Sequence, residues 1–476
     1  MFRRTGLRLI WIVFSLFGVS ALYAQNLPDS VVQLLQKVHV PADAVGVYVQ
    51  QIDAEPSDAL VSWHADALMQ PASTMKLVTS YAALDLLGPA YTWKTSVFTN
   101  GHLDDDVLVG DLILQGGGDP HLVLEDFWLL LRQLRDKGIR EIQGNLIIDR
   151  SWIESQPFDA ADFDGDPTRP YNVGPDALLI NFNVLNLQLH ADPAGLQVTA
   201  LTPLFLKSNV HVKYVSGACG EWRTQLAPVF SLVNQQIQIN LTGTYPFSCG
   251  DKSWLLQPYP LSPVDFNGAV FRGLWKELGG QLAGTVQTGN VPANAELLTT
   301  LPSQPLPDVL RAMNKYSNNV MTRLVLLTLD KEASQNPANP QRASQLVQLW
   351  FDRLGLPVQG MQLENGSGLS RTERISALQM GRMLNHAFDS RVMPEFMSSL
   401  PVLGLDGTMK NRAVNLSVAG HAHIKSGSLE GVHNLAGYVL AASGKRYVVV
   451  CFVNHKNAKF SDAAQDELLQ WVYEHG

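Results

Sequence analysis

The sequence of 476 residues lacks the features that mark several large classes of protein. It has no long block of lysine and arginine, and its formal net charge is -8, so it presents no electrostatic footprint for nucleic acid. Beyond the first 24 residues, no apolar run approaches the length of a membrane span. Internal repeats and low-complexity tracts are also absent. These absences favour a folded globular chain whose ligands are not polyanions.

Cysteine is scarce, with three residues in the whole chain. Cys219 and Cys249 lie in the same β-rich stretch, and in an oxidising compartment they can close a loop. Cys451 lies in an apolar strand, where we expect a buried thiol. The alternative, three unpaired buried thiols, stays open because a sequence does not show connectivity.

The start of the chain has the pattern of a secretory signal peptide. Arg3, Arg4 and Arg8 precede an apolar run at residues 9–22 that ends in small residues, and we expect cleavage after Ala24. No cysteine follows that position, so a lipid anchor is disfavoured, whereas an uncleaved anchor stays an alternative. Cleavage leaves 476 minus 24, or 452, residues, which is enough for two or three domains.

Strand patterns occur at both ends of the mature chain. Apolar and β-branched residues at 45–53 and 59–63 flank a turn and predict a hairpin. Three more strand-like runs precede an amphipathic helix expected at 461–473. These runs are residues 423–429, 434–442 and 446–453. We expect the hairpin and the three runs to form one five-stranded antiparallel sheet.

Between these ends the pattern changes. Residues 96–288 read as short strands separated by glycine, proline and aspartate turns, with a strand at 107–114 and one clear helix at 122–137. A helix is also expected at 74–87, where apolar residues recur at three- and four-residue spacing. Further helices are expected at 306–329, 342–354 and 376–388.

Ser73 and Lys76 form a Ser-x-x-Lys motif. On a helix this spacing puts the hydroxyl and the amine on one face, a single turn apart. A lysine ordinarily titrates at about 10.4. Lys76 can therefore act as a base at neutral pH only if burial and the positive end of the helix lower its pKa. Four-residue matches arise by chance, so the motif takes its meaning from partners elsewhere.

Two partner motifs follow in the predicted context. Ser-Asn-Asn at 317–319 lies in a mainly helical region, and Lys-Ser-Gly-Ser at 425–428 lies on a strand of the expected sheet. In this order the three motifs resemble those of penicillin-binding proteins and serine β-lactamases. Five further runs are similar to the class C low-molecular-mass penicillin-binding proteins, the D-Ala-D-Ala carboxypeptidases of peptidase family S13 (the penicillin-binding protein 4 family). They are residues 116–120, 313–315, 364–371, 404–408 and 425–429.

The resemblance implies an α+β fold. Its core is a penicillin-binding/β-lactamase-like transpeptidase domain, a five-stranded antiparallel sheet with helices on both faces plus a helical region. Ser73 and Ser317 lie 317 minus 73, or 244, positions apart, so a large insertion separates them. In the resembled family this insertion holds two β-rich domains, one nested in the other. The domains expected are a signal peptide at 1–24, the catalytic domain at 25–95 and 289–476, domain II at 96–170 and 246–288, and domain III at 171–245.

The resemblance also implies an activity: a serine D-Ala-D-Ala carboxypeptidase and D,D-endopeptidase that acts on peptidoglycan stem peptides and is acylated by penicillin. Ser73 is then the nucleophile and Lys76 its base. Ser317 relays a proton toward the leaving amine. Lys425 adjusts the electrostatic field at the site and binds the terminal carboxylate of the substrate. Asn319 forms a hydrogen bond with the amide side of the substrate.

Further residues are expected to bind the substrate. They are Ser426, Gly427 and Ser428, with the backbone N–H groups of Ser73 and Ser428 as the oxyanion hole. Ser426 stands where many relatives have threonine, and it keeps the hydroxyl. Asp149 is similar to an inserted-domain aspartate that recognises the side-chain amine of diaminopimelate. The alternative for Asp149 is a turn or cap residue at the end of a strand.

Three weaker signals have structural explanations. His421 and His423 alternate on one strand face, but no further ligand follows at a recognisable spacing, so a structural role is favoured over a metal site. The glycines at 116–118 lack the Lys-Ser/Thr of a phosphate-binding loop. Lys315 is either an exposed helix charge or part of the electrostatics around Ser317.

No cofactor and no metal are expected. The expected partners are peptidoglycan stem peptides and, as inhibitors, β-lactam antibiotics, in the bacterial periplasm. A peripheral association with the membrane or cell wall and a homodimer stay open. Two other functions are a serine β-lactamase, disfavoured by the insertion and the flanking runs, and a non-catalytic cell-wall binding protein. The second is disfavoured by five intact residues, Ser73, Lys76, Ser317, Asn319 and Lys425.

Overall fold

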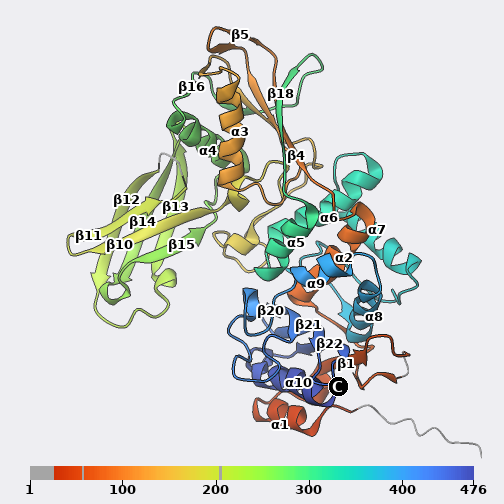
Figure 1. Cartoon of the computed structure of the whole chain (residues 1–476). Coiled ribbons are helices and arrows are strands. Elements are labelled where there is room, and N and C mark those ends of the chain that lie inside the picture. The colour runs from red at the N-terminus through yellow and green to blue at the C-terminus, as the bar shows by residue number, and fades with distance from the viewer. Residues whose placement is uncertain (1–25, 56–57, 203–205) are drawn as a thin grey trace, which may run out of the picture.

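The computed structural model describes residues 26–55, 58–202 and 206–476, so the signal peptide predicted at 1–24 lies outside the described residues. Figure 1 shows the two ends of the chain meeting in one body, while the middle of the chain forms a separate strand-rich part. The described residues include no helix with the length and apolar character needed to cross a membrane. The predicted α+β class is confirmed.

The central sheet is built from both ends of the chain, as predicted. Its order is β2-β1-β22-β21-β20, and every pair is antiparallel. Its strands are β1 (Val45–Gln51), β2 (Val61–Trp63), β20 (Ala422–Leu429), β21 (Val432–Leu440) and β22 (Arg446–Asn454). Helices cover both faces, so every residue of β22 between its two end residues is buried.

The pleat of the sheet sends alternate side chains to opposite faces. Val449 of β22 belongs to a core formed with α1 (Asp29–Lys37) and α10 (Asp462–His475). Its neighbour Val450 belongs to a second core, formed with α8 (Ala377–Phe388) and the helical region. The sheet therefore separates two apolar layers, and the second layer supports the site described below.

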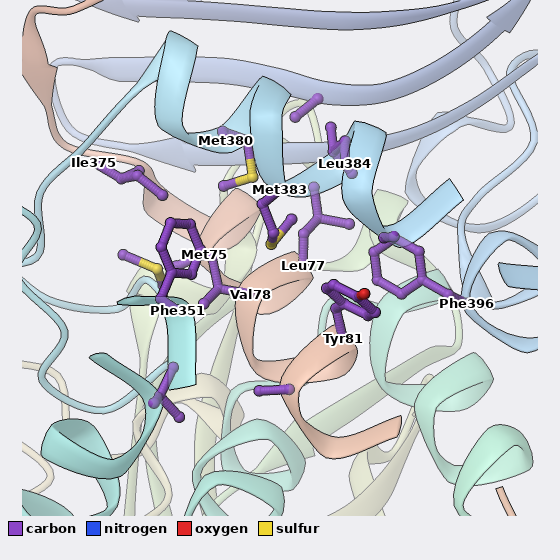
Figure 2. Packing of buried hydrophobic residues seen from close by; sticks show 14 of the residues in the cluster. Met75, Leu77, Val78, Tyr81, Phe351, Ile375, Met380, Met383, Leu384 and Phe396 are labelled. Atoms are coloured by element: carbon purple, nitrogen blue, oxygen red, sulfur yellow. The ribbon is translucent and has the colours of Figure 1, made fainter. Parts of the chain in front are cut away.

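The helical region packs on the same side of the sheet as α8. Its helices are α2 (Lys76–Leu87), α5 (Leu306–Lys315), α6 (Asn319–Ser334), α7 (Pro340–Arg353) and α9 (Met393–Ser399). Figure 2 shows Leu77 and Tyr81 of α2 among side chains of other helices, including Phe351 and Phe396. The sequence predicted a helix here from apolar residues that recur at three- and four-residue spacing, along one face. Instead every residue from Lys76 to Leu84 is buried, because the other helices and the sheet enclose α2 on all sides.

The inserted part begins with two small sheets, ordered β17-β9-β7-β4-β18 and β16-β8-β6-β5, with α3 (Leu124–Asp136) and α4 (Pro263–Glu277) packed in the same core. Their strands are β4 (Lys94–Thr99), β5 (His102–Asp104), β6 (Val107–Val109), β7 (Leu112–Gln115), β8 (Glu141–Ile142), β9 (Leu146–Asp149), β16 (Gln281–Leu282), β17 (Val286–Thr288) and β18 (Glu296–Pro302). The single strand predicted at 107–114 is wrong, because a break after β6 sends β6 and β7 to different sheets. A separate two-stranded sheet pairs β3 (Leu68–Met69) with β19 (Ile375–Ser376).

Two three-stranded sheets, ordered β11-β10-β15 and β12-β14-β13, form the nested part. Their strands are β10 (Leu185–Asp192), β11 (Gly195–Ala200), β12 (Lys207–Val215), β13 (Leu226–Val233), β14 (Gln236–Pro246) and β15 (Lys252–Leu256). A disulfide joins Cys219 to Cys249 beside these sheets, and Cys451 is a buried free thiol. Both expectations for the cysteines are confirmed.

Strand pairing revises the ends of the predicted domains, although the division into domains itself stays a prediction. β18 pairs with β4, so residues 296–302 join the inserted sheet instead of the catalytic part expected from 289 onward. β15 pairs with β10, so residues 252–256 join the nested sheets that were expected to end at 245. In both cases the partner strand lies more than 60 positions away along the chain, and no local sequence pattern predicts such a pairing.

Candidate active site

Three separate segments bring the predicted catalytic residues together. Ser73 lies in a short 3-10 helix, η3 (Ala72–Met75), which leads directly into α2. Ser317 lies in the turn between α5 and α6, and Lys425 lies on β20. The helix was expected from residue 74, directly after Ser73, and α2 begins two residues later, at Lys76. Ser73 precedes α2, but because Lys76 is the first residue of α2, the hydroxyl and the amine still meet.

The amine of Lys76 has three polar neighbours. Its Nζ lies 2.9 Å from Ser73 Oγ, 2.7 Å from Asn319 Oδ1 and 2.5 Å from the carbonyl oxygen of Ser367. The two carbonyl oxygens can only accept hydrogen bonds. A neutral amine donates to both of them and turns its lone pair to the Ser73 hydroxyl, which then donates to the amine. The arrangement is therefore that of a base ready to take the proton of Ser73.

Burial favours the neutral form of Lys76. The side chain is fully buried, and burial, followed by the positive charge of Lys425, lowers its pKa well below the ordinary value. The charge of Glu373 raises the pKa of Lys76, and the charge of Arg323 lowers it. The low pKa that the Ser-x-x-Lys motif requires thus follows from the position of Lys76 inside the fold.

Ser317 and Lys425 form a second serine–lysine pair. Lys425 Nζ donates to Ser317 Oγ at 2.8 Å and to the backbone oxygen of Ser426 at 3.0 Å. Lys425 is fully buried, and burial lowers its pKa to about 7. Ser317 has a left-handed backbone with φ 57°, a conformation that is costly for residues other than glycine and that concentrates at functional sites.

Strand β20 passes very close to the nucleophile. A Cβ atom on Gly427 would lie 2.9 Å from the backbone nitrogen of Ser73 and 2.8 Å from the Pro71 oxygen, so only glycine fits without a shift. On either side of it, Ser426 Oγ lies 3.0 Å from Thr408 Oγ1, and Ser428 is exposed. The backbone of β20 therefore runs beside Ser73, where the resemblance expects the oxyanion hole.

The inserted part of the chain also reaches the site. Asn319 Nδ2 donates to the backbone oxygen of Tyr171 at 3.2 Å. A cavity of about 700 Å³ opens between residues 150–177 of the inserted part and the loop that precedes β19; its lining includes Phe158, Asp162 and Arg371. Asn319 thus contacts Lys76 through its side-chain oxygen and the inserted segment through its nitrogen.

The carboxylate of Asp149 is enclosed, which favours the structural alternative, while its substrate-binding role stays a prediction. Asp149 ends β9 and is 1% exposed. It accepts hydrogen bonds from the backbone nitrogens of Ser151 and Val291, at 2.8 and 3.1 Å, and from Gln115 Nε2 at 3.1 Å. These bonds lower its pKa against the opposing effect of burial. These contacts are those of the structural strand-end residue that the alternative describes.

Lys315 is not a free helix charge. It pairs with Asp406, whose second oxygen accepts the backbone N–H of Val402 at 2.7 Å. The same loop carries Thr408, which contacts Ser426 on β20. Lys315 thereby links the end of α5 to the strand of the third motif. Sequence reasoning missed this link, although the signal was present in the family-like run at 404–408.

Ser367 and Glu373 were also missed. Both belong to the segment that begins with the family-like run at 364–371, to which no residue roles were given. For the two histidines, His421 packs at a tilted angle against the Tyr473 ring, and His423 Nδ1 is buried without a partner. In the part of the chain that the structure describes, no three His, Cys, Asp or Glu side chains gather as a metal site would require.

Comparison with known proteins identifies relatives along nearly the whole chain. The D-alanyl-D-alanine carboxypeptidase DacB of Haemophilus influenzae is 27% identical over 405 residues, which cover 83% of this chain and 82% of that protein. The D-alanyl-D-alanine carboxypeptidase of Actinomadura sp. (strain R39) is 26% identical over 439 residues, covering 88% of this chain and 79% of that protein.

Solved structures show the same fold. Penicillin binding protein 4 (dacB) from Haemophilus influenzae is similar with a TM-score of 0.77 at 24% identity, over 92% of this chain and 99% of that one. Its structure complexed with a novel β-lactam gives a TM-score of 0.73 at 23% identity, over 93% and 99% of the two chains. The model of the family described as D-Ala-D-Ala carboxypeptidase 3 (S13) matches residues 27–474. The chain therefore belongs to the D-Ala-D-Ala carboxypeptidase 3 (S13) family.

Proposed function

We propose that the protein is a serine D-Ala-D-Ala carboxypeptidase and D,D-endopeptidase that acts on peptidoglycan stem peptides through an acyl-enzyme on Ser73. One observation carries the proposal: Ser73 Oγ lies 2.9 Å from the buried amine of Lys76, whose two other neighbours can only accept hydrogen bonds. Family membership and the two D-alanyl-D-alanine carboxypeptidase relatives support the substrate class.

Acylation follows from the roles of Ser73 and Lys76. Lys76 takes the hydroxyl proton while Ser73 Oγ attacks the carbonyl carbon of the penultimate D-Ala. The tetrahedral oxyanion meets the backbone N–H groups of Ser73 and Ser428. The C–N bond then breaks, and the leaving amine needs a proton. Ser317, held at 2.8 Å by Lys425, supplies that proton, and Lys425 in turn replaces it.

Deacylation restores the enzyme. Water attacks the ester carbonyl and gives its proton through Ser317 to Lys425, which lost a proton during acylation. Ser73 then leaves with the proton that Lys76 has held, as the free hydroxyl. When the leaving amine is a terminal D-Ala, the enzyme is a carboxypeptidase. When it is the cross-linking amine of a neighbouring stem, the enzyme is an endopeptidase. The same bond and the same residues serve both reactions.

Substrate binding involves the strand and the turn that flank Ser73. Lys425 and the hydroxyl of Ser426 attract the terminal carboxylate, and Asn319 bonds the amide side of the substrate. Gly427 lets the backbone at Ser73 lie against β20, so a substrate backbone that follows β20 meets the nucleophile. A penicillin places its amide in the same position, and the β-lactam complex of the Haemophilus influenzae relative supports penicillin sensitivity.

The two other functions have less support. A β-lactamase requires rapid attack of water on the acyl-enzyme, whereas the relatives reported above are carboxypeptidases. A non-catalytic binding protein has no use for a buried amine with a lowered pKa beside a serine. Burying an amine costs stability, so its retention favours a catalytic role.

We further propose that the protein acts in the periplasm after loss of residues 1–24. The support is the pattern of arginines and apolar residues at the start of the chain and the disulfide, which requires an oxidising compartment. A peripheral association with the membrane or cell wall and a homodimer, both left open by the sequence, are the assemblies to test there. Cell fractionation tests the location, and light scattering coupled to gel filtration tests the homodimer.

Digestion of purified muropeptides, with products identified by mass spectrometry, tests the activity. The wild-type protein should shorten pentapeptide stems by one D-Ala and split cross-linked dimers into monomers. Ser73→Ala should leave both substrates intact. Unchanged muropeptides with the wild-type protein, or equal products with the Ser73→Ala variant, would contradict the proposal.

A further inference from the structure

A buried carboxylate outside the three motifs stabilises the turn next to the base. Glu373 is 1% exposed. Its Oε1 accepts three consecutive backbone N–H groups, from Glu364 at 3.1 Å, Asn365 at 3.0 Å and Gly366 at 2.8 Å. Three amides that converge on one oxygen form a concave anion-binding turn. The carboxylate therefore dictates the conformation of this turn.

The turn places a hydrogen-bond acceptor beside Lys76. The Ser367 carbonyl oxygen lies 2.5 Å from Lys76 Nζ, and the Gly366 carbonyl oxygen accepts the Thr79 hydroxyl at 2.9 Å. Lys76 and Thr79 lie three positions apart on α2, so both bonds come from one face of that helix. The turn is thus fixed to α2 on one side and to Glu373 on the other.

The turn also packs against the nucleophile. Gly368 has a left-handed backbone with φ 81°, and a Cβ atom there would lie 1.8 Å from the Ala72 oxygen and 2.6 Å from the Ser73 nitrogen. A displacement of the turn therefore moves either the acceptor of Lys76 or the backbone of Ser73.

The charge of Glu373 acts on the same site. Lys76 faces three other ionised groups: Lys425 of β20 and Arg323 of α6, which lower its pKa, and Glu373, which raises it. The pKa of Glu373 is raised above its ordinary value: burial is the largest cause, the three backbone N–H groups oppose it, and the nearby Glu364 adds to it. Glu373 is thus a negative charge that opposes the cations around Lys76, and Glu364 acts with it on Arg323.

We propose that Glu373 is a positioning residue for acylation: its buried carboxylate shapes the turn that presents the Ser367 carbonyl to Lys76, and its charge sets the pH range in which Lys76 works as a base. The inference rests on the proposed role of Lys76. It extends the catalytic machinery by a residue that touches neither the substrate nor the reacting atoms.

Two variants separate the charge from the hydrogen bonds. Glu373→Gln keeps an acceptor oxygen for the turn and removes the charge, whereas Glu373→Ala removes both. Glu332→Gln, which removes an exposed carboxylate of α6, is the matched control. The measurement is the second-order rate constant for acylation by penicillin G between pH 5 and 9.

Removal of the charge lowers the pKa of Lys76 further, so Glu373→Gln should shift the acid limb of the profile to lower pH by about half a unit or more. Its plateau should fall by less than about tenfold. Glu373→Ala should lower the plateau by roughly a hundredfold, the loss that follows a displacement of about 1 Å in the site. Glu332→Gln should superimpose on the wild type.

An unmoved acid limb in Glu373→Gln would overturn the inference, because a residue that supports only the fold changes the plateau and not the pH dependence. Hydrogen exchange provides a second measurement in the wild-type protein: the amides of residues 364–366 should be strongly protected, and rapid exchange there would also overturn it. Absence of acylation in the wild-type protein is a different failure, because it contradicts the proposed function itself.

Discussion

At the scale of single residues, the site depends on two lysines that the fold keeps away from water. Lys76 and Lys425 are both fully buried, and each contacts a serine. The motifs made these residues predictable because their spacing and order are local properties of the sequence. The enclosure of Asp149 was not predictable in the same way, because its bonding partners include Val291, which is 142 positions away. Whether such a carboxylate is open or enclosed depends on the folded chain.

The burial of Lys425 should cost stability. Its folded pKa of about 7 lies below the ordinary value of 10.5, so between these values the unfolded chain binds more protons and stability rises with pH. Each pKa unit corresponds to about 1.4 kcal/mol. Lys425→Met should therefore stabilise the protein at pH 7 by a few kcal/mol while it abolishes activity.

Denaturant unfolding of the wild type and of Lys425→Met at pH 7 and pH 9.5 checks this prediction. The difference in unfolding free energy between the variant and the wild type should be smaller at pH 9.5, because deprotonation of Lys425 on folding costs less free energy at that pH. A variant that is less stable than the wild type at pH 7 would show that the charge of Lys425 is compensated inside the site.

At the scale of elements, the site depends on close approaches between backbones. The sequence predicted α2, β20 and the helices around Ser317, because their apolar patterns extend over many residues. It did not predict that η3 precedes α2, nor that the turn at 364–368 packs against η3. Such contacts involve backbone atoms, and backbone atoms leave no side-chain pattern in a sequence.

Gly368→Ala tests one of these approaches. The new methyl group meets the Ala72 oxygen at 1.8 Å, so the turn or η3 must move, and acylation by penicillin should slow by at least about tenfold. Gly355→Ala is the matched control, because Gly355 also has a positive φ of 69° but has no atoms within 4 Å of a new Cβ. It should lose about 1–2 kcal/mol of stability and keep its acylation rate.

Comparable acylation rates in the two glycine variants would contradict the account of the turn. Circular dichroism and thermal melting on both proteins separate a local displacement from a loss of the fold.

At the scale of the whole molecule, the chain leaves the catalytic part after η3 and α2 and returns to it before Ser317. The large separation of the motifs predicted this insertion. Its ends were predicted less well, because β18 and β15 pair with strands that lie far away along the chain. The inserted part nevertheless contacts the site, through the bond between Asn319 and Tyr171.

The disulfide should stabilise the nested sheets without affecting the chemistry. Cys219 and Cys249 are 30 positions apart, and a loop of that length corresponds to about 3–4 kcal/mol of chain entropy. The double variant Cys219→Ser, Cys249→Ser should therefore lose stability in this part of the chain, seen as faster proteolysis between residues 185 and 256. Its rate of acylation by penicillin should match the wild type, and a large loss of that rate would contradict this separation of stability from chemistry.

Acylation of Ser73 by penicillin G, followed by intact mass and by peptide mapping, tests the central claim most directly. The strained amide of the antibiotic meets a nucleophile built for D-Ala-D-Ala. We predict one adduct per chain on the peptide that contains Ser73, and no adduct in Ser73→Ala or Lys76→Ala. An absent adduct, or an adduct on another serine, would contradict the assignment of Ser73 as the nucleophile.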